Sequence, residues 1–178
     1  MSDEGEKRGS DAHRHAGDGT MARSSMSAAE PLVTIVVPVR GDATPLAALL
    51  AQLPSRPGVQ VVVSSAAPPE ASSNALREGR PDVVWVDGPP GRGLQLNAGT
   101  AVADGRWLWF VHADSLLPDG WLDVFAALEG RQDVAGGAFA FALDSGAWQA
   151  RWLERAVAAR VALFGLPYGD QGIFVRRS

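Results

Sequence analysis

The sequence predicts an α/β fold in which helices flank a mostly parallel sheet, and two observations support this prediction. Short runs of β-branched and aromatic residues alternate with helical patterns along residues 33–128, an order typical of parallel strands joined by right-handed crossovers. The run at residues 107–111 (WLWFV) is apolar throughout, as expected of a strand buried on both faces. With 178 residues, of which 46% are hydrophobic, the chain has room for one domain and a tail.

Four apolar runs supply the strands of the parallel part of the sheet. They cover residues 33–39, 59–63, 83–86 and 107–111. The first of them, VTIVVPV, is the expected central strand, and the polar residues 40–42 form the loop after it.

Helical patterns separate and follow these strands, at residues 44–53, 71–78, 94–103 and from 119 onward. Thr44 is expected to cap the first helix, with Pro45 in its first turn. Leucines at i, i+3, i+4 and i+7 give that helix one buried stripe. Gly79 is expected to end the second helix, and Asp119 to cap the fourth.

The pattern changes after Gly137. Phe139, Phe141 and Leu143 alternate with smaller residues, which indicates an antiparallel or edge strand. A last strand is expected at residues 173–175.

A long helix is expected between these two strands, at residues 148–164. It has tryptophans at 148 and 152 and further apolar residues at 157, 161 and 164, beside arginines at 151, 155 and 160. We favour the interpretation that these apolar residues pack in the core while the arginines face solvent. The alternative is that the helix binds a membrane surface.

Residues 1–31 are rich in small and charged residues and nearly lack large apolar ones. Such a segment buries too little surface to order, so we expect a disordered N-terminal tail followed by a folded domain at 32–178. His13 and His15 lie in the tail, where a solvated segment is favoured over a metal-binding one.

The composition excludes several classes of function. The net charge of −4 gives no broad basic footprint for nucleic acid. The absence of cysteine excludes disulfides, thiolate zinc sites and a cysteine nucleophile. No apolar run is long enough for a transmembrane span, and the N-terminus has no signal-peptide core. The expected location is therefore cytoplasmic.

The strongest chemical signal is Asp114, which follows His112 just after the expected strand at 107–111. Parallel strands deliver their last residues to the edge of the sheet where open α/β folds bind ligands. A carboxylate there can hold Mg²⁺ or Mn²⁺ on substrate phosphates, and an imidazole can add a ligand. The plainer alternatives are that Asp114 caps a turn before Pro118 and that His112 is a core histidine.

A second signal is the segment at residues 91–99 (GRGLQLNAG), which opens a helix after the third strand. Glycines and free amides at a helix start can bind an anion, and Arg92 adds a planar fork for a diphosphate. Gln95 and Asn97 can hydrogen-bond sugar or phosphate. The spacing matches neither G-x-G-x-x-G nor a P-loop, and a plain turn before a helix stays possible.

A third polar segment, at residues 168–172 (YGDQG), places Asp170 between two glycines just before the last strand. Such a loop can face an acceptor hydroxyl, or it can be a plain turn.

Together these blocks resemble a family 2 glycosyltransferase of the GT-A fold, and in particular the small bacterial group described as radical-SAM/selenodomain-associated transferase 2. The resemblance covers about residues 32–177. The similar segments are the strand VTIVVPV with its loop, GRGLQLNAG, FVHADS, GGAFAF and PYGDQGIFVRR.

The resemblance implies a GT-A-like (Rossmann-like) sheet and the transfer of a sugar from a nucleotide-diphosphate donor to an unknown acceptor, with a divalent cation, Mn²⁺ or Mg²⁺, as cofactor. Asp114 would bind the metal, with His112 at the first position of the same element. The implied donor-binding residues are Pro38, Arg40, Arg92, Gln95, Asn97 and Ala113. Asp170 would be the catalytic base, with Tyr168 and Gln171 on the acceptor side.

The sequence departs from the family pattern in two places. Residues 64–70 read SSAAPPE where relatives have an aspartate-rich segment, and the chain ends at Ser178, before the E-D element that usually supplies the general base. We therefore expect a domain that is incomplete at its C-terminus. Two alternatives stay open: a non-catalytic nucleotide-sugar-binding remnant or half-protein that needs a partner, and a nucleotidyltransferase. The oligomeric state is left open.

Overall fold

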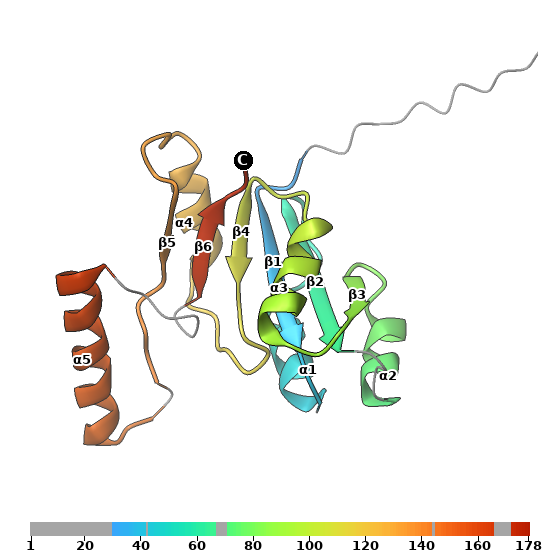
Figure 1. Ribbon diagram of the computed structural model, residues 1–178, viewed down its shortest axis with the longest axis horizontal. Helices are drawn as coiled ribbons and strands as arrows, with labels where there is room; N and C mark the ends of the chain where they lie inside the picture. Colours follow the sequence, from blue (N-terminus) through green and yellow to red (C-terminus); the bar gives the residue numbers. More distant parts are fainter. Residues whose placement is uncertain (1–29, 42, 67–70, 144, 166–171) are drawn as a thin grey trace, which may run out of the picture.

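The computed structural model describes residues 30–41, 43–66, 71–143, 145–165 and 172–178 (Figure 1). Within these residues, six strands form one sheet in the order β3-β2-β1-β4-β6-β5. The strands are β1 (Val33–Val39), β2 (Val59–Ala66), β3 (Val84–Gly88), β4 (Trp107–Phe110), β5 (Gly136–Ala138) and β6 (Ile173–Arg176). The helices are α1 (Thr44–Ala51), α2 (Ala71–Gly79), α3 (Arg92–Ala101), α4 (Trp121–Leu128) and α5 (Trp148–Phe164).

The sheet is mostly parallel, as the sequence predicts. Strand β1 lies in its middle and pairs in parallel with β2 on one side and β4 on the other, and β3 extends the parallel part beyond β2. The last strand β6 runs antiparallel to both β4 and β5. The carboxyl ends of β1, β2, β3 and β4 therefore meet at one edge of the sheet (Figure 1).

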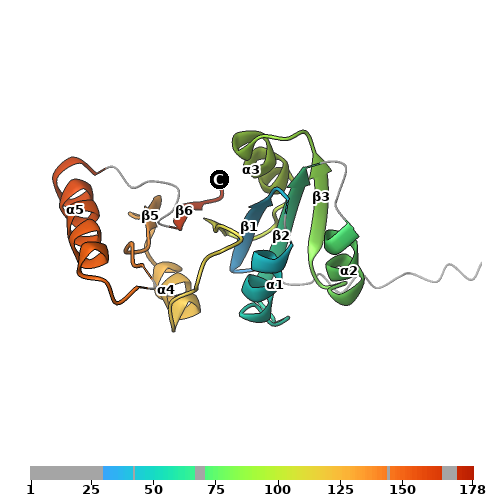
Figure 2. The ribbon, with the colours of Figure 1, turned by 90° about the horizontal axis from the view of Figure 1, so that it is seen from below.

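Helices cover both faces of the sheet: α3 lies on one side, and α1, α2 and α4 lie on the other (Figure 2). The alternation of side chains along β1 explains this division. Val33, Ile35, Val37 and Val39 belong to the main hydrophobic core together with the leucines of α1, whereas Val36 faces α3.

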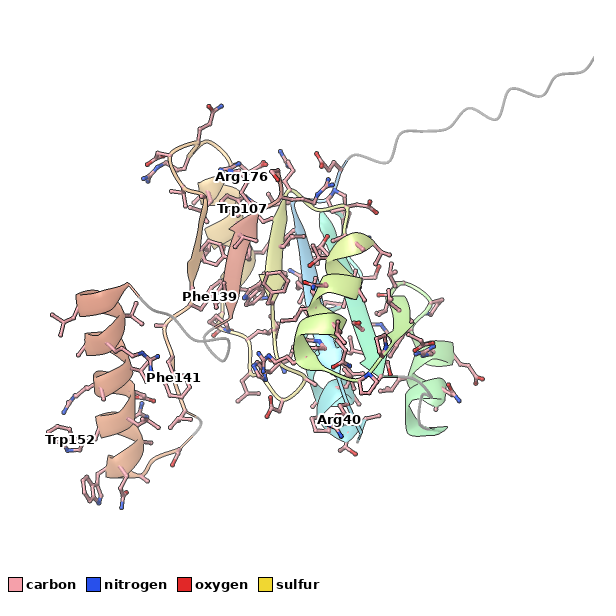
Figure 3. All side chains as sticks on the ribbon, in the orientation of Figure 1. Arg40, Trp107, Phe139, Phe141, Trp152 and Arg176 are labelled. Carbon is pink, nitrogen blue, oxygen red and sulfur yellow. The ribbon has the colours of Figure 1, made fainter. Side chains whose placement is uncertain are left out.

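Aromatic side chains fill the core between β4, β6 and α4. Trp107 and Trp109 of β4 pack against Phe125 of α4, with ring centroids 6.4 and 5.6 Å apart. The guanidinium of Arg176 lies 4.3 Å from the ring centroid of Trp107 (Figure 3), and it donates a 2.7 Å hydrogen bond to the carbonyl of Arg131. The aromatic run of β4 is therefore core, as its sequence predicts.

Helix α3 approaches the sheet closely. A Cβ atom placed on Gly99 would lie 2.5 Å from Cγ1 of Val36 and 3.6 Å from Cγ1 of Val62, so only glycine allows this distance between the helix and strands β1 and β2. One turn earlier, Gln95 lies on the same side of the helix and is 3% exposed.

Two predicted helix caps are wrong. Helix α1 begins at Thr44 itself, with Ala43 in the N-cap position and no side-chain cap bond. Helix α4 has Gly120 as its N-cap, at a φ of 70°, because the chain turns into this helix in the left-handed region that glycine adopts most easily. In both cases the entry into the helix is set by the loop path rather than by a hydroxyl or carboxylate cap.

Several predicted bounds also shift. The edge strand is present and antiparallel, but it covers 136–138 rather than the alternating residues 139–143, because only the earlier segment pairs with β6. Phe139 instead packs on Trp109, with ring centroids 4.8 Å apart. Helix α3 starts at Arg92 rather than at 94, and β3 covers 84–88 rather than 83–86.

Helix α5 has the predicted length, but the prediction that its apolar stripe belongs to the core is wrong for the tryptophans. Trp148 and Trp152 are 69% and 64% exposed, whereas Ala150 and Val157 are buried. The helix lies beyond β5, at the end of the sheet (Figures 1 and 2). It thus turns only one side toward the domain. Among the described residues, no helix combines the length and the hydropathy needed to cross a bilayer.

The close approach of α3 predicts that Gly99→Ala destabilises the fold. The added methyl group overpacks the contact with Val36, so we expect the free energy of unfolding to fall by about 1–3 kcal/mol. Urea denaturation of the full chain measures this change.

Gly93→Ala in the same helix is the matched control. No heavy atom lies within 4 Å of a Cβ atom placed there, so alanine should raise the free energy of unfolding by about 0.5–1 kcal/mol through helix propensity. If the two variants changed the free energy of unfolding equally, the close contact of α3 with Val36 would not explain the effect of Gly99→Ala.

Candidate functional site

The chain reverses its direction across the sheet between β1 and β4. It proceeds from β1 outward to β2 and β3, and then returns through α3 to place β4 on the other side of β1. In open α/β sheets, ligands bind in the crevice outside the carboxyl ends of the strands at such a switch point. The β1/β4 edge is therefore the candidate functional site.

Polar residues follow both strands at this edge. Arg40 comes directly after β1 and is exposed, and Figure 3 shows it at the end of the sheet where β1 terminates. Pro38, the penultimate residue of β1, is partly exposed and pairs with Ser64 of β2. After β4, His112 and Ala113 are partly exposed and Asp114 is exposed.

Arg92 also belongs to this group, although it comes from the start of helix α3 and not from the end of a strand. It is the first residue of α3, and its guanidinium contacts the ring of His112, with Nη1 3.2 Å from Nδ1 and Nη2 against Nε2. A guanidinium only donates hydrogen bonds and a neutral imidazole has one acceptor nitrogen, so one of the two contacts is a hydrogen bond. The structure thus brings together two residues that lie 20 positions apart and that the sequence singled out separately.

The start of α3 can bind an anion. Gly91 occupies the N-cap at a φ of 137° and makes no side-chain cap bond. The first amides of a helix have no partner within the helix and sit at the positive end of its dipole. Together with Arg92, they form a donor set suited to phosphate oxygens.

Gln95 is not brought to the open edge. It is 3% exposed, and its amide nitrogen donates to the carbonyls of Val39 and Ser64, the latter at 3.0 Å. These two carbonyls lie near the carboxyl ends of β1 and β2. Gln95 therefore fastens α3 to the strand ends that frame the site, and it has no exposed surface for a sugar.

Asn97 lies on a different side of α3. It is exposed, and residues two positions apart on a helix point in nearly opposite directions, so Asn97 faces away from the strands that Gln95 contacts.

Of the two residues predicted to bind a divalent cation, Asp114 fits this role better than His112. Among the described residues, no group of three histidine, aspartate or glutamate side chains could hold a metal ion. Asp114 fits the arrangement in which one carboxylate and the substrate's phosphates hold Mg²⁺ or Mn²⁺. His112 fits less well, because Arg92 lies against both of its ring nitrogens and would have to turn away first.

A further carboxylate, Asp87, lies near the end of β3 and received no role from the sequence. Arg77 of α2 binds it through both guanidinium nitrogens, one at 2.8 Å. This hydrogen bonding holds the pKa of Asp87 below its usual range and raises that of Arg77. Asp87 shares the sequence pattern that indicated Asp114, an acidic residue at the end of a strand. The charge of Asp87, however, is compensated by Arg77 within the domain.

Ser64 of β2, the first residue of the SSAAPPE segment, received no role of its own from the sequence. It is fully buried, and its hydroxyl has no hydrogen-bond partner among the residues that the structure describes. A buried serine in an apolar strand has no local sequence pattern that would distinguish it.

Tyr168, Asp170 and Gln171 lie outside the described residues. The segment that follows them is fixed beside β4, since the indole nitrogen of Trp109 donates a 3.1 Å hydrogen bond to the carbonyl of Gly172.

Comparison by sequence finds no family model that matches the chain and no similar protein among the curated ones. Comparison by structure does find matches. The crystal structure of TarS residues 1–349 from S. aureus is similar at a TM-score of 0.54 and 16% identity, over 65% of this chain and 37% of that one.

A second match is glucosyl-3-phosphoglycerate synthase from Mycobacterium tuberculosis, solved in complex with Mn²⁺, UDP and phosphoglyceric acid. Its TM-score is 0.54 at 14% identity, over 81% of this chain and 55% of that one. The chain thus spans between about a third and just over half of the length of these structures. Both are GT-A glycosyltransferases, and at these identities the similarity shows that the chain has a GT-A-like α/β fold.

The position of Gln95 predicts that Gln95→Met destabilises the fold. Methionine has a similar shape but leaves the carbonyls of Val39 and Ser64 without this donor, which should cost about 1–3 kcal/mol of the free energy of unfolding. Asn97→Met on the exposed side of α3 is the control and should change it by less than about 0.5 kcal/mol. If Gln95→Met were as stable as the parent chain, the hydrogen bonds of Gln95 to the two carbonyls would not be needed for folding, and the side chain would be free to bind a ligand.

Proposed function

We propose that this chain is a glycosyltransferase domain that binds a nucleotide-diphosphate sugar at the carboxyl edge between β1 and β4. The observation that supports this most is the contact between Arg92 and His112 at the switch point of a GT-A-like sheet. It brings Arg92 and the start of α3 against His112, two residues before the exposed carboxylate of Asp114. A cation, helix amides and a carboxylate are the groups that suit a metal-bound diphosphate.

In this proposal, Arg92 and the first amides of α3 bind the diphosphate of the donor. The guanidinium offers two parallel donors to phosphate oxygens, and its contact with His112 holds it at the edge before the donor arrives. Pro38, Arg40 and Ala113 are the further donor-binding residues that we propose. Asn97, which the sequence also assigned to the donor, faces away from these strand ends and is not included. Gln95 contributes by positioning α3.

Asp114 is the residue that we propose for the divalent cation, Mn²⁺ or Mg²⁺. When bound, the cation would neutralise the charge that develops on the departing nucleoside diphosphate. Asp114 is exposed, so it can bind a cation that enters together with the nucleotide.

The acceptor side is proposed from the sequence. Transfer with inversion needs a carboxylate that accepts the proton of the acceptor hydroxyl, and Asp170 is the candidate base, with Tyr168 and Gln171 beside it in the chain. We also propose a cytoplasmic location, because nucleotide sugars are present there. The motifs GRGLQLNAG and FVHADS support a further proposal, that the chain belongs to the radical-SAM/selenodomain-associated transferase 2 group.

The role of Asp114 predicts the behaviour of Asp114→Asn. Calorimetric titration with UDP and with GDP, with and without Mn²⁺, measures how much the cation strengthens nucleotide binding. We expect Mn²⁺ to strengthen binding to the parent chain and to have no effect on the variant, because asparagine cannot supply the negative charge. Asp119→Asn, another exposed acid after β4, should behave like the parent chain; an Asp114→Asn variant that did so too would remove the metal role.

The role of Arg92 predicts that Arg92→Ala weakens binding of the Mn²⁺–nucleotide complex by about 1.5–3 kcal/mol, the range for hydrogen bonds to charged groups. Arg131→Ala is the matched control, since Arg131 is exposed and pairs with Asp133 far along the chain from the site. A variant that loses stability in urea but keeps its affinity would indicate that Arg92 serves only the turn before α3.

A second candidate function is a nucleotide-sugar-binding module without turnover. It is favoured by the contact of Arg92 with both nitrogens of His112 and, among the described residues, by the absence of a group of three metal-ligating side chains. A turnover assay with a panel of UDP- and GDP-sugars distinguishes the two functions, because donor hydrolysis above background contradicts a mere binding module. Release of pyrophosphate instead of nucleoside diphosphate would identify a nucleotidyltransferase.

A further inference from the structure

Helix α5 has two apolar sides, and only one of them faces the domain. On the inner side, Ala150 and Val157 are 7% and 8% exposed. On the outer side, Trp148, Trp152 and Leu163 are 69%, 64% and 75% exposed. Large apolar residues at such exposure, gathered on one element, mark an interaction surface.

The outer residues form one continuous stripe. Trp148, Trp152 and Leu163 are spaced by 4 and 11 positions, and Ala156 and Ala159 lie between them on the same side, so all five fall within about a quarter of the helix circumference. We call these five residues the outer stripe. Figure 3 shows Trp152 on the side of α5 that points away from Phe141 and the sheet.

Arginines border the outer stripe on both sides. By helical spacing, Arg151 and Arg155 lie along one border and Arg160 along the other. The helix contains one acidic residue, Glu154, which binds Arg151 at 2.8 Å and accepts a hydrogen bond from the backbone of Leu143. The helix is therefore basic, although the whole chain has a net charge of −4.

The outer stripe is accessible because α5 stands beyond the edge of the sheet. An apolar cavity of about 530 Å³ separates its inner side from the segment after β5; Phe139, Phe141, Ala158 and Val161 are among the lining residues. Both ribbon views show α5 as the outermost element at this end of the domain (Figures 1 and 2). A flat surface can therefore reach the whole length of the stripe.

We propose that α5 docks on the surface of an anionic lipid bilayer. The outer stripe enters the boundary between headgroups and acyl chains, and Arg151, Arg155 and Arg160 contact lipid phosphates. An apolar stripe bordered by arginines, with tryptophan among the apolar residues, is the pattern of helices that lie in the plane of a membrane interface. Tryptophan is enriched at this depth because its ring is apolar and its N–H finds a polar partner.

Charge favours a bilayer over a second copy of the chain. If two copies packed through the same stripe, the arginines of one helix would lie against those of the other, and like charges across an interface are destabilising. Anionic headgroups instead attract the basic helix along both borders of the stripe. The proposal is independent of sugar transfer, since it uses no residue of the β1/β4 edge.

Flotation of the full chain with lipid vesicles tests the proposal. We expect the protein to float with vesicles of phosphatidylcholine mixed with phosphatidylglycerol, to float much less with phosphatidylcholine alone, and to be released by high salt. Absence of flotation with the anionic vesicles would overturn the proposal.

Variants of the outer stripe give the sharper test. Trp148→Gln combined with Trp152→Gln should lower the partition coefficient by about tenfold or more. Leu163→Gln should lower it by about fivefold. Leu116→Gln should leave it unchanged, because Leu116 lies after β4, outside the stripe, although it is 66% exposed. Arg155→Gln should lower it by about fivefold, and Arg131→Gln should not. Circular dichroism verifies that each variant keeps the helix content of the parent chain.

Two further measurements separate the bilayer from other occupants of the stripe. Lipids with brominated acyl chains should quench the fluorescence of Trp148 and Trp152. The double tryptophan variant should show no such decrease in fluorescence when these lipids are added. Quenching that persists in this variant would place the contact elsewhere. A dimer in sedimentation experiments that the same variant dissociates would show that a second copy covers the stripe, and it would overturn the proposal.

Discussion

The close packing of α3 on strands β1 and β2 determines where the residues of the candidate site lie. Gly99 lets the helix reach Val36 and Val62, and Gln95, one turn earlier, fastens it to the carbonyls of Val39 and Ser64. Because α3 is a rigid element, these two contacts also fix its first residue, Arg92, against His112 after β4. The position of Arg92, for which we propose phosphate binding, is thus a consequence of packing one to two turns farther along the same helix.

The candidate site and α5 occupy different parts of the domain and use arginine differently. Arg92 contacts His112, two residues before the exposed Asp114, where we propose that its planar fork binds a diphosphate. The arginines of α5 border an apolar stripe on an outer helix, where their charge suits a surface of many phosphates. In our two proposals, arginine thus binds a single anion in one place and an extended anionic plane in the other.

Much of the fold was predictable because its signals are local. Trp107–Phe110 is apolar throughout and Val33–Val39 is apolar except for Thr34, because both faces of a central strand are covered, and this shows in the sequence. The caps of α1 and α4, the burial of Gln95 and the exposure of Trp148 depend on how distant segments pack, and no local pattern reveals them. The sequence singled out Arg92 separately from His112 and Asp114. Only the fold shows that Arg92 contacts His112 and that Gln95 is buried away from the open edge.

Binding of a metal nucleotide between β1 and β4 is most directly tested by nuclear magnetic resonance with Mn²⁺, whose unpaired electrons broaden nearby amide signals. In the presence of UDP, the account predicts that broadening is confined to the end of β1 near Arg40, the start of α3 near Arg92 and the turn after β4 near Asp114. Broadening centred on another part of the domain, or none when UDP and Mn²⁺ are both present, would contradict it.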